Sequence, residues 1–366
     1  MSNSIGLYIH IPFCKSKCPY CDFFSGKGNE QKYEKYANTL IDKIKYWSTK
    51  TDKTVSTVYF GGGTPSIIGA DLLSDILMAV KRFFKVEKNA EITVEINPDS
   101  GKVIDFEKLR HSGFNRISVG LQSACKKELD ALGRIHSAAD ARLTAARAKK
   151  SGINNISLDL MLGIPYQTED SLKNSVEFCA DCGVTHISSY ILKVEKGTRF
   201  YLNRDKLDLP DEDMQAKLYL LAVEKLASLG YEQYEISNFA KKGFESRHNI
   251  NYWKCGEYIG IGPSAHSFLN GKRFYYSRSL GDFENDRTVF DCDGGNEEEF
   301  IMLSLRLKSG LDFNEYKKRF GSPLPSYAMQ KIKSYVKAGF MVADDDRAYF
   351  TPKGFLVSNT IISDLI

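Results

Sequence analysis

Three of the eight cysteines are grouped within eight residues, as Cys14, Cys18 and Cys21 in the pattern C-x3-C-x2-C. Three thiolates at this spacing can hold three irons of a [4Fe–4S] cluster and leave the fourth iron open to an exchangeable ligand. A structural zinc site would require a fourth ligand nearby, usually from a second C-x2-C pair. The sequence therefore predicts an iron–sulfur cluster that can bind a substrate or cofactor as well as pass electrons.

The elements that must position this loop follow a repeating order. Short β-branched runs alternate with helical patterns over the first two-thirds of the chain, which indicates six βα units around a parallel sheet. Strand counting alone leaves an open doubly wound sheet and a curved partial barrel as alternatives. The expected strands are 7–11, 57–60, 91–96, 116–119, 156–160 and 186–191, and the expected helices are 30–48, 70–84, 103–111, 138–150, 169–182 and 212–229.

The positions of the polar and glycine motifs favour the barrel. Nearly all of them end or directly follow an expected strand, at 14–21, 61–64, Glu95, Gln122 and Asp159. In a barrel the carboxyl ends of parallel strands form one rim, where cofactor-binding and catalytic residues converge. We therefore expect an α/β fold in which residues 1–230 form a partial (β/α)6 barrel.

Beyond residue 230 the pattern changes. Residues 231–295 are rich in aromatic residues and glycine, and we expect an irregular segment that covers one side of the barrel. Residues 296–366 predict a winged-helix-like α+β module, with helices near 297–308, 312–320 and 326–338, a hairpin about 344–347 and a last helix from Pro352. Because 14 Lys and Arg balance 14 Asp and Glu over 269–366, the module lacks the basic footprint of a nucleic-acid binder.

The composition is that of an ordinary globular protein, with 42% hydrophobic and 26% charged residues. Disordered and fibrous classes are thereby excluded. The formal net charge of +4 is too small for the whole chain to act as a polyanion binder. Without an 18-residue apolar run or a signal peptide, we expect a cytoplasmic protein with no transmembrane segment and with reduced thiols, including an inert pair at Cys179 and Cys182.

The cysteine loop resembles that of the radical S-adenosylmethionine superfamily, and the glycine run 61–63 after the second strand resembles its glycine motif. Over nearly the whole chain the sequence is similar to the anaerobic coproporphyrinogen III oxidase family. The matching segments are 8–14 (YIHIPFC), 95–98 (EINP), 118–123 (SVGLQS), 132–134 (LGR) and 159–165 (DLMLGIP). The resemblance implies a radical-SAM type barrel that carries a [4Fe–4S] cluster and S-adenosylmethionine.

The resemblance also implies which residues contact S-adenosylmethionine. Arg134 and Glu95 have the charges that suit its carboxylate and ammonium groups, and Asp159 and Gln122 could hold the ribose hydroxyls. The full implied set is Tyr8, Tyr20, Gly62, Gly63, Thr64, Glu95, Gln122, Arg134 and Asp159, with Tyr20 near the adenine.

Two departures separate this sequence from the oxidases of that family. Oxidases carry a fourth cysteine two residues after the third, where this chain has Phe23, and they have a longer segment before the cluster than the 13 residues found here. In addition, residues 248–253 (HNINYW) match the H-N-x-x-Y-W motif of the haem-chaperone (HemW-like) branch. This resemblance implies a haem chaperone that passes haem to an acceptor protein, with an electron donor for the cluster.

The alternative functions are oxygen-independent coproporphyrinogen III oxidase and a winged-helix nucleic-acid regulator. The second is disfavoured by the zero net charge of the C-terminal module.

An axial haem ligand is usually His, Cys, Met or Tyr, and His248 is the first candidate because it begins the branch motif. Alternatively, His248 could only orient its loop through hydrogen bonds. His266 is the reserve candidate, followed by Cys255 and His10.

Overall fold

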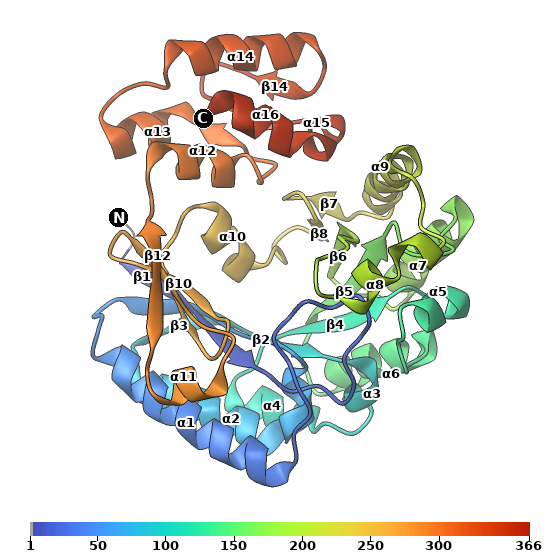
Figure 1. Cartoon of the computed structure of the whole chain (residues 1–366), viewed down its shortest axis with the longest axis vertical. Coiled ribbons are helices and arrows are strands. Elements are labelled where there is room, and N and C mark those ends of the chain that lie inside the picture. The colour runs from blue at the N-terminus through green and yellow to red at the C-terminus, as the bar shows by residue number, and fades with distance from the viewer. Residues whose placement is uncertain (1–2) are drawn as a thin grey trace.

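The computed structural model describes residues 3–366, and a curved sheet of twelve strands organises most of the molecule (Figure 1). Its middle is formed by six adjacent parallel strands in chain order, as the sequence predicts. They are β1 (Ser4–Ile11), β2 (Thr54–Gly62), β3 (Val86–Ile96), β4 (Arg116–Gln122), β5 (Asn155–Leu162) and β6 (His186–Ile191). The strand order has two free edges, so the barrel is partial rather than closed.

Helices cover the convex face of this sheet (Figure 1). The six expected helices are present, although the one expected at 103–111 begins only at Phe106. They are α1 (Glu30–Ser48), α2 (Gly69–Phe83), α4 (Phe106–Ser112), α6 (Ala138–Lys150), α7 (Glu169–Asp181) and α9 (Glu212–Ser228). Shorter helices are α3 (Pro98–Gly101), α5 (Lys126–Ala131) and α8 (Arg199–Leu202), with 3-10 turns η1 (Pro65–Ile68) and η2 (Arg204–Lys206).

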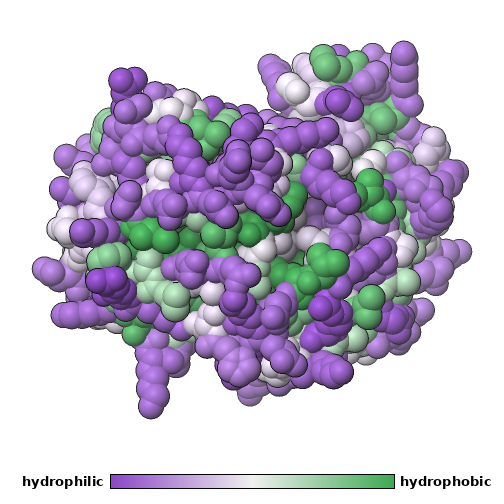
Figure 2. All heavy atoms as spheres, turned by 90° about the horizontal axis from the view of Figure 1, so that it is seen from below, coloured by the Kyte–Doolittle hydropathy of each residue, from purple (hydrophilic) through white to green (hydrophobic). Residues whose placement is uncertain are grey.

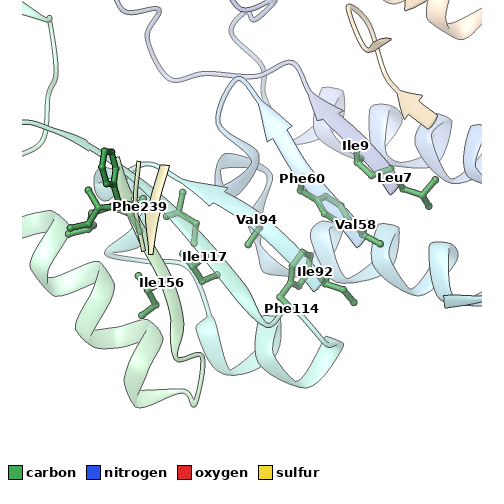
Figure 3. Packing of buried hydrophobic residues seen from close by; sticks show 14 of the residues in the cluster. Leu7, Ile9, Val58, Phe60, Ile92, Val94, Phe114, Ile117, Ile156 and Phe239 are labelled. Atoms are coloured by element: carbon green, nitrogen blue, oxygen red, sulfur yellow. The ribbon is translucent and has the colours of Figure 1, made fainter. Parts of the chain in front are cut away.

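Strand alternation divides apolar from polar side chains. Leu7, Val58 and Ile117 are fully buried on the helix-facing side, where they pack into the main core (Figure 3). Burial of each such side chain contributes about 1.5–3 kcal/mol. Because successive residues of a strand point to opposite faces, the neighbouring Tyr8 and Ser118 point into the barrel interior. The interior is therefore lined by polar and aromatic groups.

The prediction that 231–295 is irregular is wrong. This segment adds six strands to the two edges of the sheet, because β8 pairs antiparallel with β6 and β9 pairs parallel with β1. The strands are short, and their partners are distant in the chain, so local periodicity does not reveal them. They are β7 (Glu232–Gln233), β8 (Asn238–Ala240), β9 (Tyr258–Ile261), β10 (His266–Leu269), β11 (Lys272–Tyr276) and β12 (Thr288–Asp293), accompanied by α10 (Arg247–Trp253) and α11 (Leu280–Glu284).

The C-terminal module contains the expected three helices, hairpin and terminal helical segment. Its elements are α12 (Glu297–Ser304), β13 (Leu311–Asp312), α13 (Phe313–Phe320), α14 (Ser326–Lys337), β14 (Met341–Ala343), β15 (Arg347–Phe350), α15 (Pro352–Leu356) and α16 (Ser358–Leu365). Backbone hydrogen bonds from Ile236 to Arg306 and from Lys308 to Tyr234, each 2.9 Å, join the module to the sheet edge. The domain limits at 230 and 295 stay a prediction.

The surface away from this module is mostly hydrophilic, with apolar side chains gathered in a band across its middle (Figure 2). Among residues 3–366, no helix has both the length and the apolar character needed to cross a membrane.

Candidate cofactor site

The loop that follows β1 is held by short backbone hydrogen bonds. Cys14 N donates to Gly26 O at 2.9 Å, and Thr64 N donates to Phe13 O at 2.7 Å. These bonds join the cysteine loop to the turn after β2. All three cysteines of the loop line one cavity of about 260 Å³, together with Gly62, Gly63, Thr64, Glu95, Gln122, Arg134, Asp159 and Tyr20. The structure thus brings most of the predicted site residues to the same hollow.

The thiols have polar and cationic neighbours. Arg134 Nη1 donates to Cys18 Sγ at 3.4 Å, and Cys14 Sγ lies 3.4 Å from Thr64 Oγ1. Burial raises the pKa of Cys21. Among the described residues, no three His, Cys, Asp or Glu side chains, these thiols included, lie close enough together to hold a single metal ion. The donor set fits an iron–sulfur cluster in its chemistry, because three free, partly exposed thiols share the cavity with the guanidinium of Arg134, which donates to one of them.

The glycine run is required by close packing against the cysteine loop. A Cβ on Gly63 would lie 2.6 Å from the carbonyl oxygen of Phe13, and Gly62 has a φ of +111°. A side chain at Gly63 would therefore push the turn after β2 away from the loop, and one at Gly62 would be strained and would meet the ring of His10. The hydroxyl of Thr64, next along, accepts a hydrogen bond from Asn97 Nδ2 at 2.9 Å.

Two buried carboxyl groups lie in the cavity. Burial raises the pKa of Glu95 to about 7, although Tyr59 donates a 2.8 Å hydrogen bond to its carboxylate. Burial likewise raises the pKa of Asp159 to about 6, although Ser118 donates to its carboxylate at 3.1 Å. A cationic or hydroxyl-bearing ligand would stabilise the ionised form of each group.

Arg134 and Gln122 extend the polar wall. Arg134 Nη2 donates to Asn97 Oδ1 at 3.0 Å and to the carbonyl of Gly120 at 2.9 Å, while its buried Nε has no partner among residues 3–366. Gln122 accepts a hydrogen bond from Tyr190 at 3.0 Å, and its φ of +73° is rare for a residue other than glycine. Backbone strain of this kind is common at ligand sites.

The two predicted tyrosines differ in position. Tyr20 lines the cavity, where its hydroxyl lies 3.5 Å from Arg134 Nη1. Tyr8 is not among the residues that line the cavity. Its ring packs against Gly61, where an added Cβ would lie 3.0 Å from it, and its hydroxyl is hydrogen-bonded to His10 Nδ1 at 3.1 Å. The structure therefore places Tyr8 as a support for the glycine turn rather than on the surface of the cavity.

His248 is enclosed within the protein. Its Nδ1 lies 2.7 Å from Thr57 Oγ1 and its Nε2 lies 2.7 Å from the hydroxyl of Tyr252, while the backbone N–H donates to Glu91 at 3.0 Å. Burial lowers the pKa of His248 to about 3. Neither ring nitrogen is open to an external metal in this conformation, so the geometry favours the orienting role of His248 over the ligand role.

The other candidate haem ligands also differ in accessibility. His10 is buried with both ring nitrogens hydrogen-bonded, to Tyr8 and to the carbonyl of Phe24. Cys255 is buried beside Glu299. His266 is exposed, and its ring is stacked on Tyr275 with the centroids 4.9 Å apart.

The cavity also contains residues that sequence analysis missed. They lie on the strands and on α10 below the rim: Arg116, Ser157, His186, Ser188, Asn238 and Asn249. The available signal was the polar character of alternate strand positions, for example Arg116 two residues before Ser118. No spacing rule links these residues, which come from separate units.

Comparison with known proteins places this arrangement in a family. The Radical SAM superfamily matches residues 8–179, and the HemN C-terminal domain matches residues 298–357. A Mycobacterium tuberculosis protein named heme chaperone HemW is 31% identical over 99% of this chain and 94% of its own length. The Bacillus subtilis protein of the same name is 32% identical over 97% of both chains. This chain belongs to the HemW family.

Other comparisons are consistent with HemW membership. The Escherichia coli heme chaperone HemW is 37% identical over 72% of this chain and 69% of that protein. The solved structure of coproporphyrinogen III oxidase (HemN) from Escherichia coli has a TM-score of 0.83, covers 100% of this chain and 90% of its own, and is 21% identical. At that identity, the structural match shows that this chain and the oxidase share a fold.

Proposed function

We propose that this protein is a haem chaperone that binds haem and transfers it to an acceptor protein. The observation that carries the proposal is similarity over nearly the whole chain to proteins named heme chaperone HemW. We also propose that Cys14, Cys18 and Cys21 hold a [4Fe–4S] cluster, which a separate electron donor reduces. The shared cavity of the three thiols supports this assignment.

The same cavity would hold S-adenosylmethionine. In its families this cofactor, when bound to a reduced cluster, supplies one-electron cleavage chemistry. Arg134 would bind the methionyl carboxylate, and Glu95 would bind the ammonium group. Asp159 and Gln122 would accept hydrogen bonds from the ribose, with Tyr20 beside the adenine and the glycine turn admitting the methionyl group.

For the haem ligand, the contacts favour His266 over His248. His266 is exposed and stacked on an aromatic ring, whereas both nitrogens of His248 already have partners. Haem titration of His248→Ala and His266→Ala, followed by the Soret band, tests the assignment. A shifted band only in His266→Ala supports His266. An unchanged band in that variant, with a shift in His248→Ala, would return the ligand role to His248.

The function itself is tested with purified, cluster-reconstituted protein. We expect a saturable Soret change on haem addition, transfer of bound haem to an apo-haemoprotein, and no anaerobic conversion of coproporphyrinogen III. Turnover at roughly 1 per second or faster, the range of ordinary enzymes, would instead establish the oxidase alternative.

A further inference from the structure

Arg116 has an unusual environment for a charged side chain. It begins β4, is only 2% exposed, and lines the cavity. Throughout residues 3–366 no hydrogen bond or ion pair reaches its guanidinium, and its buried Nε is without a partner. A buried, unpaired charge is costly, and groups of this kind are rare in native proteins unless a ligand, ion or water completes them.

The nearby carboxylates do not satisfy this guanidinium. Glu95 accepts its hydrogen bond from Tyr59, and Asp159 accepts from Ser118. Glu91 accepts from the backbone N–H groups of Arg247 and His248, each at 3.0 Å. Arg116 lies near enough to lower the pKa values of Glu95 and Asp159 by its charge, but it forms no ion pair with either. Its hydrogen-bonding capacity is therefore left for a ligand.

Apart from these carboxylates, the cavity-lining groups near Arg116 include neutral polar ones. His186 is fixed by Ser157 at 2.8 Å and by Tyr234 at 2.9 Å, and burial keeps it neutral by lowering its pKa. Asn249 of α10 lines the cavity, and its side-chain amide has no hydrogen-bond partner within the described residues. A free guanidinium fork beside a free amide suits a carboxylate, which accepts two parallel hydrogen bonds from arginine.

Arg116 lies at a lower position along the barrel than the rim, although it lines the same cavity. Arg134 bonds to the carbonyl of Gly120, which is four residues beyond Arg116 on β4. At a rise of about 3.3 Å per residue, the two levels are about 13 Å apart along the strand. Arg134 is therefore anchored near the end of β4, whereas Arg116 extends from the start of the same strand.

We propose that Arg116, assisted by Asn249, binds a carboxylate of a second ligand below the S-adenosylmethionine site, and that this carboxylate is a propionate of the bound tetrapyrrole. The assignment of the propionate rests on the proposed haem function. The alternative source of the same chemistry is the carboxylate of S-adenosylmethionine itself.

The experiment compares haem with haem dimethyl ester, in which both propionates are blocked. Equilibrium titrations use reconstituted wild type, Arg116→Gln and Arg116→Lys, with S-adenosylmethionine affinity measured in parallel. We expect wild type to bind haem roughly 10- to 100-fold more tightly than the ester, the usual range for a charge-assisted hydrogen bond. Arg116→Gln should abolish that preference, and Arg116→Lys should keep part of it. S-adenosylmethionine affinity should stay unchanged in Arg116→Lys, which keeps the positive charge near Glu95. In Arg116→Gln it should fall only as far as the pKa of Glu95 rises, so the loss should disappear at a pH high enough to ionise Glu95.

Asn249→Asp provides a second test that leaves Arg116 in place. Its new carboxylate competes for the guanidinium, so we expect haem affinity to fall while ester affinity holds. Arg110→Gln, which removes one exposed positive charge from α4, is the matched control and should retain the haem preference. Far-UV circular dichroism and iron content establish that each variant is folded.

The possible results distinguish a failure of the propionate assignment to Arg116 from a failure of the proposed haem function. If wild type binds haem but does not distinguish it from the ester, or if Arg116→Gln and Asn249→Asp keep the preference, the inference is overturned and the chaperone proposal stands. If Arg116→Gln weakens S-adenosylmethionine binding even at a pH at which Glu95 is ionised, the carboxylate belongs to that cofactor and the inference is wrong. If wild type binds no haem, both proposals fall.

Discussion

Arg134 Nη1 lies 3.4 Å from the Sγ of Cys18, a residue 116 positions earlier in the chain. The cation thereby joins the cysteine loop to the wall of the barrel, where its other terminal nitrogen donates to the carbonyl of Gly120. A cationic donor suits a sulfur that carries negative charge as a metal ligand. One side chain thus connects the proposed cluster with the proposed cofactor pocket.

Replacing Cys14, Cys18 and Cys21 together by serine should abolish the iron–sulfur cluster. No other three cysteines of the sequence are grouped at this spacing, and serine does not replace thiolate in such a site. Iron and sulfide analysis and the visible spectrum of anaerobically purified protein give the measurement. The control is the double variant Cys179→Ser and Cys182→Ser, which alters two free thiols at the end of α7. Unchanged iron and sulfide content in the triple variant would refute the assignment.

S-adenosylmethionine should bind more tightly as the pH rises from 6 to 8. Glu95 has a pKa of about 7 because it is buried, so at pH 6 most of it is protonated and cannot pair with an ammonium group. Ionisation of this single group predicts about tenfold higher affinity at pH 8 than at pH 6. Equilibrium dialysis across this range measures the effect.

The variant Glu95→Gln tests whether ionisation of Glu95 causes the pH dependence of S-adenosylmethionine binding. The variant should bind weakly and with a flat pH profile, because the ionisable group is gone. Should the variant keep the tenfold rise, the pH dependence arises elsewhere, and Glu95 is not the partner of the ammonium group.

His248→Ala should lower the free energy of unfolding by about 2–4 kcal/mol, since it leaves buried hydroxyls of Thr57 and Tyr252 without a partner. The exposed His266 provides the contrast, with an expected change within about 0.5 kcal/mol for His266→Ala. Urea unfolding of cluster-free protein is the measurement. Equal effects of the two substitutions would contradict the orienting role of His248.

The difference in the free energy of unfolding between wild type and His248→Ala should depend on pH. Because burial lowers the pKa of folded His248 to about 3, the unfolded chain takes up the proton first as the pH falls below its ordinary pKa of 6.5. The stabilising contribution of neutral His248 is complete above pH 6.5 and declines toward pH 3. The difference between wild type and His248→Ala should therefore narrow from pH 7 to pH 5, whereas a constant difference would contradict the buried neutral state.

Phe23→Cys should not create oxidase activity. Phe23 is 66% exposed at the cavity, so the substitution supplies a thiol at the position where oxidases of the wider family have one. The rest of the interior remains that of the HemW family. Anaerobic incubation with coproporphyrinogen III and chromatography of the porphyrins measures the outcome. Protoporphyrinogen formation by the variant alone would show that this single position separates the two activities.

Much of the barrel and its rim could be predicted from the sequence, because the information is local. The spacing of Cys14, Cys18 and Cys21 and the alternation of six strands with six helices are visible within short windows. Helix α1 and strand β6 have the bounds that the pattern predicts. Each depends on neighbouring residues through strand alternation, helix periodicity and capping.

Tertiary structure decided what depends on distant partners. Strand β9 is parallel to β1 although some 250 residues separate them, and no periodicity records that pairing. His248 became an internal support only because Thr57, 191 residues away, occupies its Nδ1. The sequence likewise determined that Arg116 is an arginine on a strand, whereas its burial without a partner depends on every strand and helix that surrounds it. Residue type and local spacing thus determine which chemistry is available, and only packing of remote segments decides which polar groups are left free to bind a ligand.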